Sequence, residues 1–484
     1  MRHFAGLLCS IVLLALLGSA RPAGAAPGLL LGAVEDQVRA PTLAEAQSKI
    51  AQLRLAGFRA VRIESIWTPG ATEPTPDELA VLRSVSTAGQ MEGVRILVTV
   101  MQFGSRTTPL TDEEQSQFAS YAAAVVREAN VRAIIVGNEP NLNRFWLPQF
   151  GPDGSDAAAA SYYTLLARTY DAIKAVSSDT TVYGLAVSPR GSDNPDGIRP
   201  THSPTAFIRD VGAAYRASGR TKPIMDALSI HVYEDTSSLP PTFAHPLTTA
   251  IAIADYDKLV GILGQAFDGT AQAGSTLPIL YGEYGVETQI PAGKSSLYTG
   301  TEPTTTKPTT EATQASYYQQ ALAMSFCQPT VEGILILHTI DESPLDRWQS
   351  GLFYADGTPK RSLAPVRAAL NRTAGGSIAH CPGIELPVRA TKVRFAGRAA
   401  ARQGQFRASF TCLLDCLYQV RVLKVSTGAT KMVKVGRASI GEPVQVQFAP
   451  HHLGRGEYRY RLRLVHPVNP APPTIRDGPV FSLP

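Results

Sequence analysis

One stretch of the sequence decides our interpretation of the fold: Ile134-Ile135-Val136-Gly137-Asn138-Glu139-Pro140-Asn141. Its apolar residues are typical of a buried strand, which stops abruptly where Asn138, a carboxylate and further turn-forming residues follow. Such a pattern places Glu139 at the carboxyl end of the strand, where loops gather and ligands bind in α/β folds. A second apolar run, residues 278–284, carries Glu283 in the same way near its end.

Strand-like and helix-like segments alternate eight times along the chain. Strands, mostly continuous apolar runs rich in Val, Ile and Leu, are expected at Leu29–Val34, Ala60–Ile66, Val94–Met101, Val131–Gly137, Thr181–Val187, Asp226–Val232, Leu277–Gly282 and Glu332–Leu337. Runs of this kind are typical of parallel strands covered on both faces. Eight successive β–α units predict a closed (β/α)8 TIM barrel, an α/β fold. Because no Gly-rich phosphate loop follows the first strand, we expect no dinucleotide.

The intervening segments carry helix start signals. Capping-box spacing occurs at Thr42 and Glu45, at Thr75 and Glu78, and at Thr111 and Glu114, while Pro76 suits a first helical position. The long connections of the second half include a Thr/Pro tract, residues 298–313, for which we keep two interpretations. It shapes the cleft as a catalytic-face loop does, or it is a disordered insertion.

The chain divides into four parts by composition. Residues 1–26 have the polar start, apolar middle and small-residue end of a secretory signal peptide, so we expect a secreted or extracytoplasmic protein. The barrel takes residues 27–372, and residues 373–387 are a linker. Later apolar runs are too short to cross a membrane, and we expect no nucleic-acid partner.

Residues 388–484 show two-residue alternation, most clearly in Glu457–Leu464. This pattern predicts a small immunoglobulin-like β-sandwich, an accessory domain. From about residue 375 onward, Lys and Arg outnumber Asp and Glu roughly threefold. The excess is either an ordinary solvated face or a contact surface for an acidic cell-surface polymer.

Cys327, Cys381, Cys412 and Cys416 remain once the signal peptide is removed. An even number in an oxidising compartment favours disulfides. We expect Cys412–Cys416 across a tight turn and Cys327–Cys381 at the end of the barrel. Metal binding is the rival interpretation, but no matching His cluster accompanies these cysteines.

Glu139 and Glu283 form the carboxylate pair that glycosidic bond cleavage requires. A retaining glycosidase needs one ionised carboxylate to attack and one protonated carboxyl to assist departure, about 5 Å apart. Arg62 and Tyr233, at the ends of other strands, are candidate donors to the ionised member. The three tryptophans, Trp67, Trp146 and Trp348, all follow strand ends, where rings stack on flat sugar faces.

These motifs resemble those of clan A glycoside hydrolases. The resemblance rests on Asn138-Glu139-Pro140 in the fourth unit, Glu283 in the seventh, His231-Val232-Tyr233 in the sixth, Val61-Arg62-Ile63 in the second and the run from Gly351 to Lys360. Asn138-Glu139-Pro140-Asn141 followed by Phe145-Trp146 is most similar to family 39, with family 5 close behind. The resemblance covers residues 28–370.

The resemblance implies a role for each matching position. Glu139 is the implied acid/base and Glu283 the nucleophile; Asn138 binds the sugar 2-hydroxyl, Arg62 and Tyr233 keep Glu283 ionised, and His231 lines the subsite. The chain departs from the family at the eighth strand, where Leu337-His338-Thr339 stands in place of the usual tryptophan. Either His338 or another ring takes that place.

The sequence therefore predicts a secreted retaining β-glycosidase that hydrolyses a polysaccharide or oligosaccharide by double displacement. It needs no metal or organic cofactor, because proton transfer and one covalent ester suffice. The alternative is a noncatalytic carbohydrate-binding or cell-wall-associated protein on a degenerate barrel, and the altered eighth strand motivates it.

Overall fold

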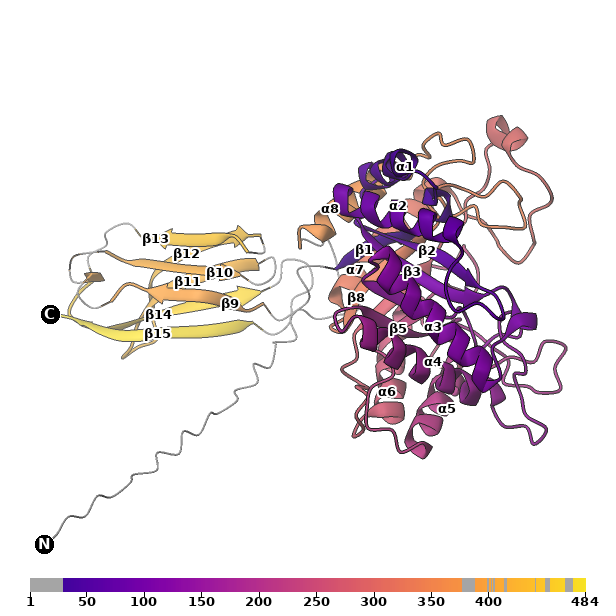
Figure 1. Cartoon of the computed structure of the whole chain (residues 1–484). Helices are drawn as coiled ribbons and strands as arrows, with labels where there is room; N and C mark the ends of the chain where they lie inside the picture. The colour runs from indigo at the N-terminus through magenta and orange to yellow at the C-terminus, as the bar shows by residue number, and fades with distance from the viewer. Residues whose placement is uncertain are drawn as a thin grey trace, which may run out of the picture.

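The barrel and the C-terminal sheets form the two folded parts of the chain (Figure 1). A computed structural model describes residues 29–376, 388–397, 400–401, 403, 405–412, 416–439, 441–448, 453–465 and 473–484. The expected signal peptide lies outside these residues, as does most of the expected linker. Helix α8 (Leu363–Ala374) extends two residues beyond the boundary that we expected at residue 372.

Eight parallel strands close into a barrel in chain order, which confirms the expected fold. They are β1 (Leu30–Val34), β2 (Ala60–Trp67), β3 (Arg95–Gln102), β4 (Ala133–Val136), β5 (Thr181–Val187), β6 (Ala227–His231), β7 (Ile279–Tyr284) and β8 (Val331–Leu337). Pairing of β1 with β8 completes the barrel, from Leu30 opposite Gly333 to Val34 opposite Leu337. Closure brings the carboxyl ends of all eight strands to one face.

Helices follow the strands and cover the barrel. They are α1 (Leu43–Leu55), α2 (Pro76–Glu92), α3 (Asp112–Ala129), α4 (Ala157–Val176), α5 (Pro204–Ala217), α6 (Tyr256–Phe267), α7 (Glu311–Cys327) and α8. The expected caps are present: the side chains of Thr42, Thr75 and Thr111 each accept the N–H three residues on. Only Thr111 and Glu114 make the full reciprocal capping box.

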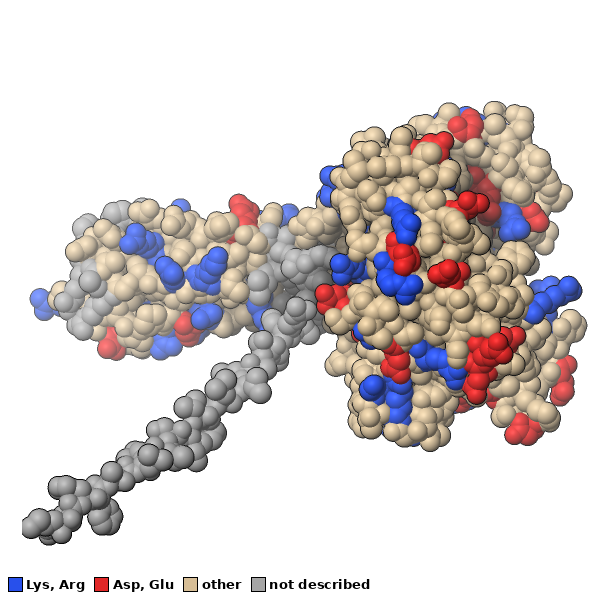
Figure 2. Space-filling view, viewed as in Figure 1, with Lys and Arg blue, Asp and Glu red and all other residues tan. Residues whose placement is uncertain are grey.

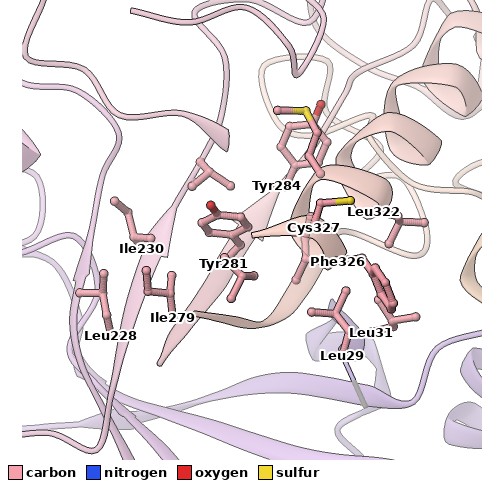
Figure 3. Close-up of a cluster of buried hydrophobic side chains, with 14 of the residues drawn as sticks. Leu29, Leu31, Leu228, Ile230, Ile279, Tyr281, Tyr284, Leu322, Phe326 and Cys327 are labelled. Carbon is pink, nitrogen blue, oxygen red and sulfur yellow. The ribbon is translucent and has the colours of Figure 1, made fainter. Parts of the chain in front are cut away.

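Two apolar layers hold the barrel together, because side chains alternate along each strand. Residues such as Leu97, Ile135 and Leu335 fill the inside of the barrel. The intervening residues face the helices; Figure 3 shows a part of this layer, where side chains of β1, β6, β7 and α7 meet. Tyr281 and Phe326 are buried there, so the strands offer rigid ends from which loop side chains project.

The C-terminal part is built of two antiparallel sheets, as expected. The strands are β9 (Ala390–Phe395), β10 (Arg407–Cys412), β11 (Cys416–Lys424), β12 (Thr430–Ala438), β13 (Pro443–Gln447), β14 (Gly456–Val465) and β15 (Thr474–Leu483). The sheet orders are β13-β10-β9 and β12-β11-β14-β15. Rings from the two sheets meet between them: Phe395 stacks on Tyr460, and Phe410 contacts Tyr418 edge-on.

The Cys412–Cys416 disulfide joins β10 to β11, as predicted. The other expected pair, Cys327–Cys381, includes Cys381, which lies outside the described residues. Among the helices that the structure describes, none is both long and apolar enough to cross a bilayer.

Candidate active site

A cavity of about 1060 Å³ opens at the carboxyl ends of the barrel strands. Its lining combines strand ends with the loops that follow them, including Thr305 and Thr306 of the Thr/Pro tract. The N–H of Ser237 donates to the carbonyl of Thr306 at 3.0 Å, which joins this tract to the loop after β6. Of our two interpretations of the tract, this placement favours the one in which it shapes the cleft.

Backbone geometry after β4 presents Glu139 to the cavity. Gly137 has φ +76° and Glu139 has φ +41°, so the chain turns sharply through a region that a glutamate rarely adopts. The Glu139 N–H donates to the carbonyl of Ala186 at 2.9 Å, which ties the turn to β5. A Cβ on Gly137 would lie 3.2 Å from the Tyr162 ring, so the sequence needs glycine there for both reasons.

Glu283 lies within β7, where Arg62 of β2 and Tyr233, which follows β6, bind its carboxylate. Arg62 Nη1 donates to Oε1 at 2.6 Å, and the Tyr233 hydroxyl donates to Oε2 at 2.8 Å. Burial alone raises the pKa of Glu283, but His231, Arg62 and the hydrogen bond from Tyr233 outweigh it and lower that pKa. Glu283 is therefore ionised at neutral pH.

His231 connects the two carboxylates. Its Nδ1 lies 2.8 Å from Glu139 Oε1 and 3.3 Å from Glu283 Oε2. Since both oxygens approach one nitrogen, they lie at most about 6 Å from each other. Nε2 of the same ring is 3.5 Å from Arg62 Nη1, a group that only donates. An N–H at Nδ1 therefore faces both carboxylates.

Arg62 is fixed from several sides, although it is buried. Its Nε donates to Thr99 Oγ1 at 2.7 Å and its Nη2 donates to Asn138 Oδ1 at 3.1 Å. The guanidinium thereby orients the side-chain amide of Asn138 in the cavity wall. The pKa of Arg62 is raised: burial lowers it, and the charges of Glu283 and Glu64 outweigh burial.

The structure thus brings together the carboxylate pair, Glu139 and Glu283, and four residues that the sequence predicted around it: Arg62, Asn138, His231 and Tyr233. An anionic carboxylate held by two donors is equipped to attack an electrophilic carbon. The second carboxyl, set across the imidazole, is equipped to exchange a proton. No group of His, Cys, Asp and Glu with metal-binding geometry occurs in the described part of the chain.

We expected Trp67 and Trp146 to contact substrate. The structure corrects this expectation, because both rings are buried and lie outside the cavity lining. Trp67 shares its strand face with the helix-facing Val61 and Ile63, and its ring packs edge-on against Phe118 of α3. Trp146 donates from Nε1 to Ser161 Oγ at 2.9 Å under the loop after β4. The alternation of side chains along β2 therefore turns Trp67 toward the helices, and packing of the loop after β4 buries Trp146.

Trp348 and His338, in contrast, line the cavity. The Trp348 ring stacks on Tyr233, with centroids 4.8 Å apart and planes 23° apart. His338 Nδ1 donates to the carbonyl of Val34 at 2.9 Å, which places the imidazole at the junction of β8 and β1. We expected either His338 or another ring in the place of the missing tryptophan. Both the imidazole of His338 and the indole of Trp348 are present at this wall of the cavity.

Among the lining residues absent from our predicted site are Phe103, Asp36 and Glu64. Phe103, after β3, is 79% exposed at the cavity edge. Asp36 and Glu64 contribute carboxylates near the ends of β1 and β2. Their positions at strand ends were the available signal, but several other acids share it. Glu35, for example, is buried and accepts the N–H groups of Thr339 and Ile340, which is a structural role.

No protein-family model matches the chain, and no curated protein matches its sequence. The chain is similar to the solved structure of a glucosidase from Croceicoccus marinus, with 14% identity, TM-score 0.48, 88% of this chain covered and 95% of that one. Similar values hold for an endo-1,4-beta-mannanase from Rhizomucor miehei: 10% identity, TM-score 0.45, 72% and 95% covered.

A beta-glucuronidase from Bacteroides uniformis is also similar, with 13% identity, TM-score 0.46, 94% of this chain covered and 46% of that one. The chain thus spans less than half the length of that structure. These proteins differ in the sugar that their names state.

Proposed function

We propose that this protein is a secreted retaining β-glycosidase that hydrolyses a polysaccharide or oligosaccharide by double displacement. The observation that carries the proposal is the contact of one His231 nitrogen with both Glu139 and Glu283. It keeps the nearest oxygens within about 6 Å. Retaining enzymes hold their carboxyl groups about 5–5.5 Å apart, whereas inverting enzymes need about 6.5–9.5 Å to admit a water molecule.

In the proposed mechanism Glu283 attacks the anomeric carbon and Glu139 gives its proton to the departing oxygen. Water then enters, Glu139 takes a proton from it, and the ester to Glu283 is hydrolysed. Arg62 and Tyr233 keep Glu283 ionised before the attack. They stabilise its carboxylate again when the ester is hydrolysed and Glu283 leaves the sugar. His231, with one N–H facing both acids, orients them, and Asn138 offers its amide to the sugar.

The test is covalent trapping. A panel of 2-deoxy-2-fluoro β-glycosides with a good leaving group should inactivate the enzyme with stoichiometric release of that group. Peptide mapping should then find the sugar on Glu283. NMR of the first product released from an aryl β-glycoside should show the β-anomer. Release of the α-anomer would contradict retention, and a label on Glu139 would reverse the assigned roles.

The noncatalytic alternative keeps the cavity as a binding site only. The observation that favours this alternative is His338, because the glycoside hydrolases that the sequence resembles usually have tryptophan at this position. Binding of an oligosaccharide in calorimetry, with no labelling and no hydrolysis across the whole panel, would select this alternative. Hydrolysis that depends on both Glu139 and Glu283 would exclude it.

We also propose that the C-terminal sheets contact an anionic polymer outside the cell. Figure 2 shows Lys and Arg side chains spread over the visible face of this part. Arg421 of β11 stands directly opposite Arg461 of β14, an arrangement of like charges that destabilises a sheet. An anionic ligand would relieve that repulsion. Removal of unpaired arginines from this face should then weaken retention of the chain on an anionic polysaccharide.

A further inference from the structure

Asp36 and Glu64 form a second carboxylate pair on the wall of the cavity, beside the nucleophile. Asp36 follows β1, and its Oδ1 accepts the backbone N–H of Glu64 at 2.9 Å. Glu64 Oε1 lies 4.0 Å from Arg62 Nη2, while Arg62 Nη1 binds Glu283. One guanidinium therefore separates Glu64 from Glu283, and a sugar held by Glu283 lies next to this pair.

The two side chains have acceptor capacity to spare. Among the described residues no donor makes a hydrogen bond to the Glu64 carboxylate, and its side chain is 36% exposed. Asp36 accepts through Oδ1 and lines the cavity. Burial raises the pKa of Asp36 and of Glu64, and the charges of Arg62 and Arg39 oppose that rise at both residues. The charge of Glu35 adds to it at Asp36, and the charges of Asp36 and Glu283 add to it at Glu64. The contributions of these neighbouring acids show that a further negative charge here is unfavourable.

The two arginines whose charges act on this pair, Arg62 and Arg39, also bind other acceptors. Arg62 is occupied by Glu283 and Asn138, and Arg39 pairs with Glu78 at 2.6 Å. The arginines that line the cavity, all exposed, are Arg144, Arg190 and Arg347. Nine acidic residues share that lining with them: Glu35, Asp36, Glu64, Glu139, Glu234, Asp235, Glu283, Glu287 and Glu342.

We propose that Asp36 and Glu64 select the sugar that binds beside Glu283, by accepting hydrogen bonds from its hydroxyl or ammonium groups and by repelling carboxylate and sulfate groups. The substrate class is then a neutral or amino-sugar glycan, and uronic acids are excluded. This inference rests on the proposed function. Like charges brought together in a partly desolvated site are strongly unfavourable, which makes such exclusion effective.

The test compares 4-nitrophenyl β-glycosides that differ only at carbon 6: glucoside with glucuronide, and galactoside with galacturonide. We expect kcat/KM for the better neutral compound to exceed that of its uronide by about 100-fold or more. Glu64→Gln and Asp36→Asn should each narrow this ratio about tenfold, by raising KM for the neutral sugar and lowering it for the uronide. The 2-amino-2-deoxyglucoside reports whether an ammonium group is accepted too.

The matched control is Asp346→Asn, which removes one exposed negative charge from the loop after β8 without touching the lining. It should leave the ratio unchanged. A uronide cleaved as well as its neutral partner would overturn the inference, as would a ratio that neither Glu64→Gln nor Asp36→Asn alters.

Failure of the proposed function is recognisable separately, because then no compound of the panel is hydrolysed and no fluoro-sugar labels Glu283. The inference is still tested in that case by calorimetric titration of the full chain with cellotetraose, mannotetraose and tetragalacturonate. Binding of a neutral oligosaccharide alone supports it. Binding of tetragalacturonate as tightly as the neutral compounds overturns it.

Discussion

The cavity of the barrel and the outer face of the four-stranded sheet both carry one kind of charge in excess, but they are built differently. In the cavity, side chains from β2, β6 and β7 converge, and Arg62, Tyr233 and His231 all contact Glu283. On the sheet, Arg459 and Arg461 share the single carboxylate of Asp477.

Convergence explains the difference. Barrel closure turns the ends of separate strands toward one point, so opposite charges meet at hydrogen-bonding distance in a partly buried site. Parallel rows of a sheet keep their side chains apart, and solvent screens them. We therefore expect each charge of the cavity to control chemistry, and each charge of the sheet to contribute a small and salt-dependent amount of binding.

The largest expected effect tests this contrast directly. Glu283→Gln removes the nucleophile and should lower kcat by about 10⁴-fold or more, with folding intact. Glu139→Gln should lower kcat about 10²–10⁴-fold for substrates with poor leaving groups, because these need the acid. The equivalent charge removal on the sheet, Asp477→Asn, should leave hydrolysis of a soluble aryl glycoside unchanged. Comparable losses of kcat in all three variants would contradict the difference that we expect between the charges of the cavity and those of the sheet.

Two stacked ring pairs allow a second comparison. Trp348 stacks on Tyr233 in the cavity, whereas Phe395 stacks on Tyr460 between the C-terminal sheets. Trp348→Ala should raise KM about tenfold with little change in melting temperature, since the ring faces the cavity. Phe395→Ala should cost about 3 kcal/mol of unfolding free energy, the lower end for such truncations because the ring is partly exposed. Urea titration and steady-state kinetics on both variants measure the two effects, and an unchanged KM in Trp348→Ala would remove this ring from the site.

A third prediction concerns the donors to Glu283. Activity requires the ionised form, so it falls as pH drops through the pKa of Glu283. Tyr233 helps to lower that pKa, so Tyr233→Phe should raise it and move the acid limb of kcat/KM up by about one pH unit. Tyr163→Phe, which removes a hydroxyl that donates to Ser218 at the surface, is the control and should not move the acid limb. An acid limb unchanged by Tyr233→Phe would mean that another group controls it.

Sequence patterns predicted the barrel because each strand ends in a recognisable way. The helix caps at Thr42, Thr75 and Thr111 and the apolar runs are local signals, and the structure contains all of them. The residues around Glu283 were predictable for a related reason. In a closed parallel barrel the position along a strand decides which end a side chain occupies.

The errors in the predicted site arose where the position along a strand was not enough, and the face of the strand or the path of a loop also had to be known. Trp67 occupies the right end of β2 but the wrong face, since it alternates in step with Val61 and Ile63 toward the helices. Trp146 lies in a loop, whose path no periodicity describes. Asp36 and Glu64 were not singled out from the other acids at strand ends, because polar residues there are common. Only the fold distinguishes acids with spare acceptor capacity from those in structural hydrogen bonds, such as Glu35.

The smallest expected effect lies on the sheet face. Arg421 and Arg463 have no acidic partner among the described residues, so they are free to bind an anion. Arg421→Gln and Arg463→Gln should each weaken retention of the full chain on an immobilised anionic polysaccharide by a few-fold at low salt, and the double variant by more. Sodium chloride should abolish the difference as the screening length falls from about 10 Å at 0.1 M to about 3 Å at 1 M. Arg407→Gln, on the opposite sheet, is the matched control and should leave retention unchanged.

Because Arg421 faces Arg461, removal of the Arg421 charge should not lower the melting temperature. Equal retention of all variants at every salt concentration would show that this face of the sheet is only solvated.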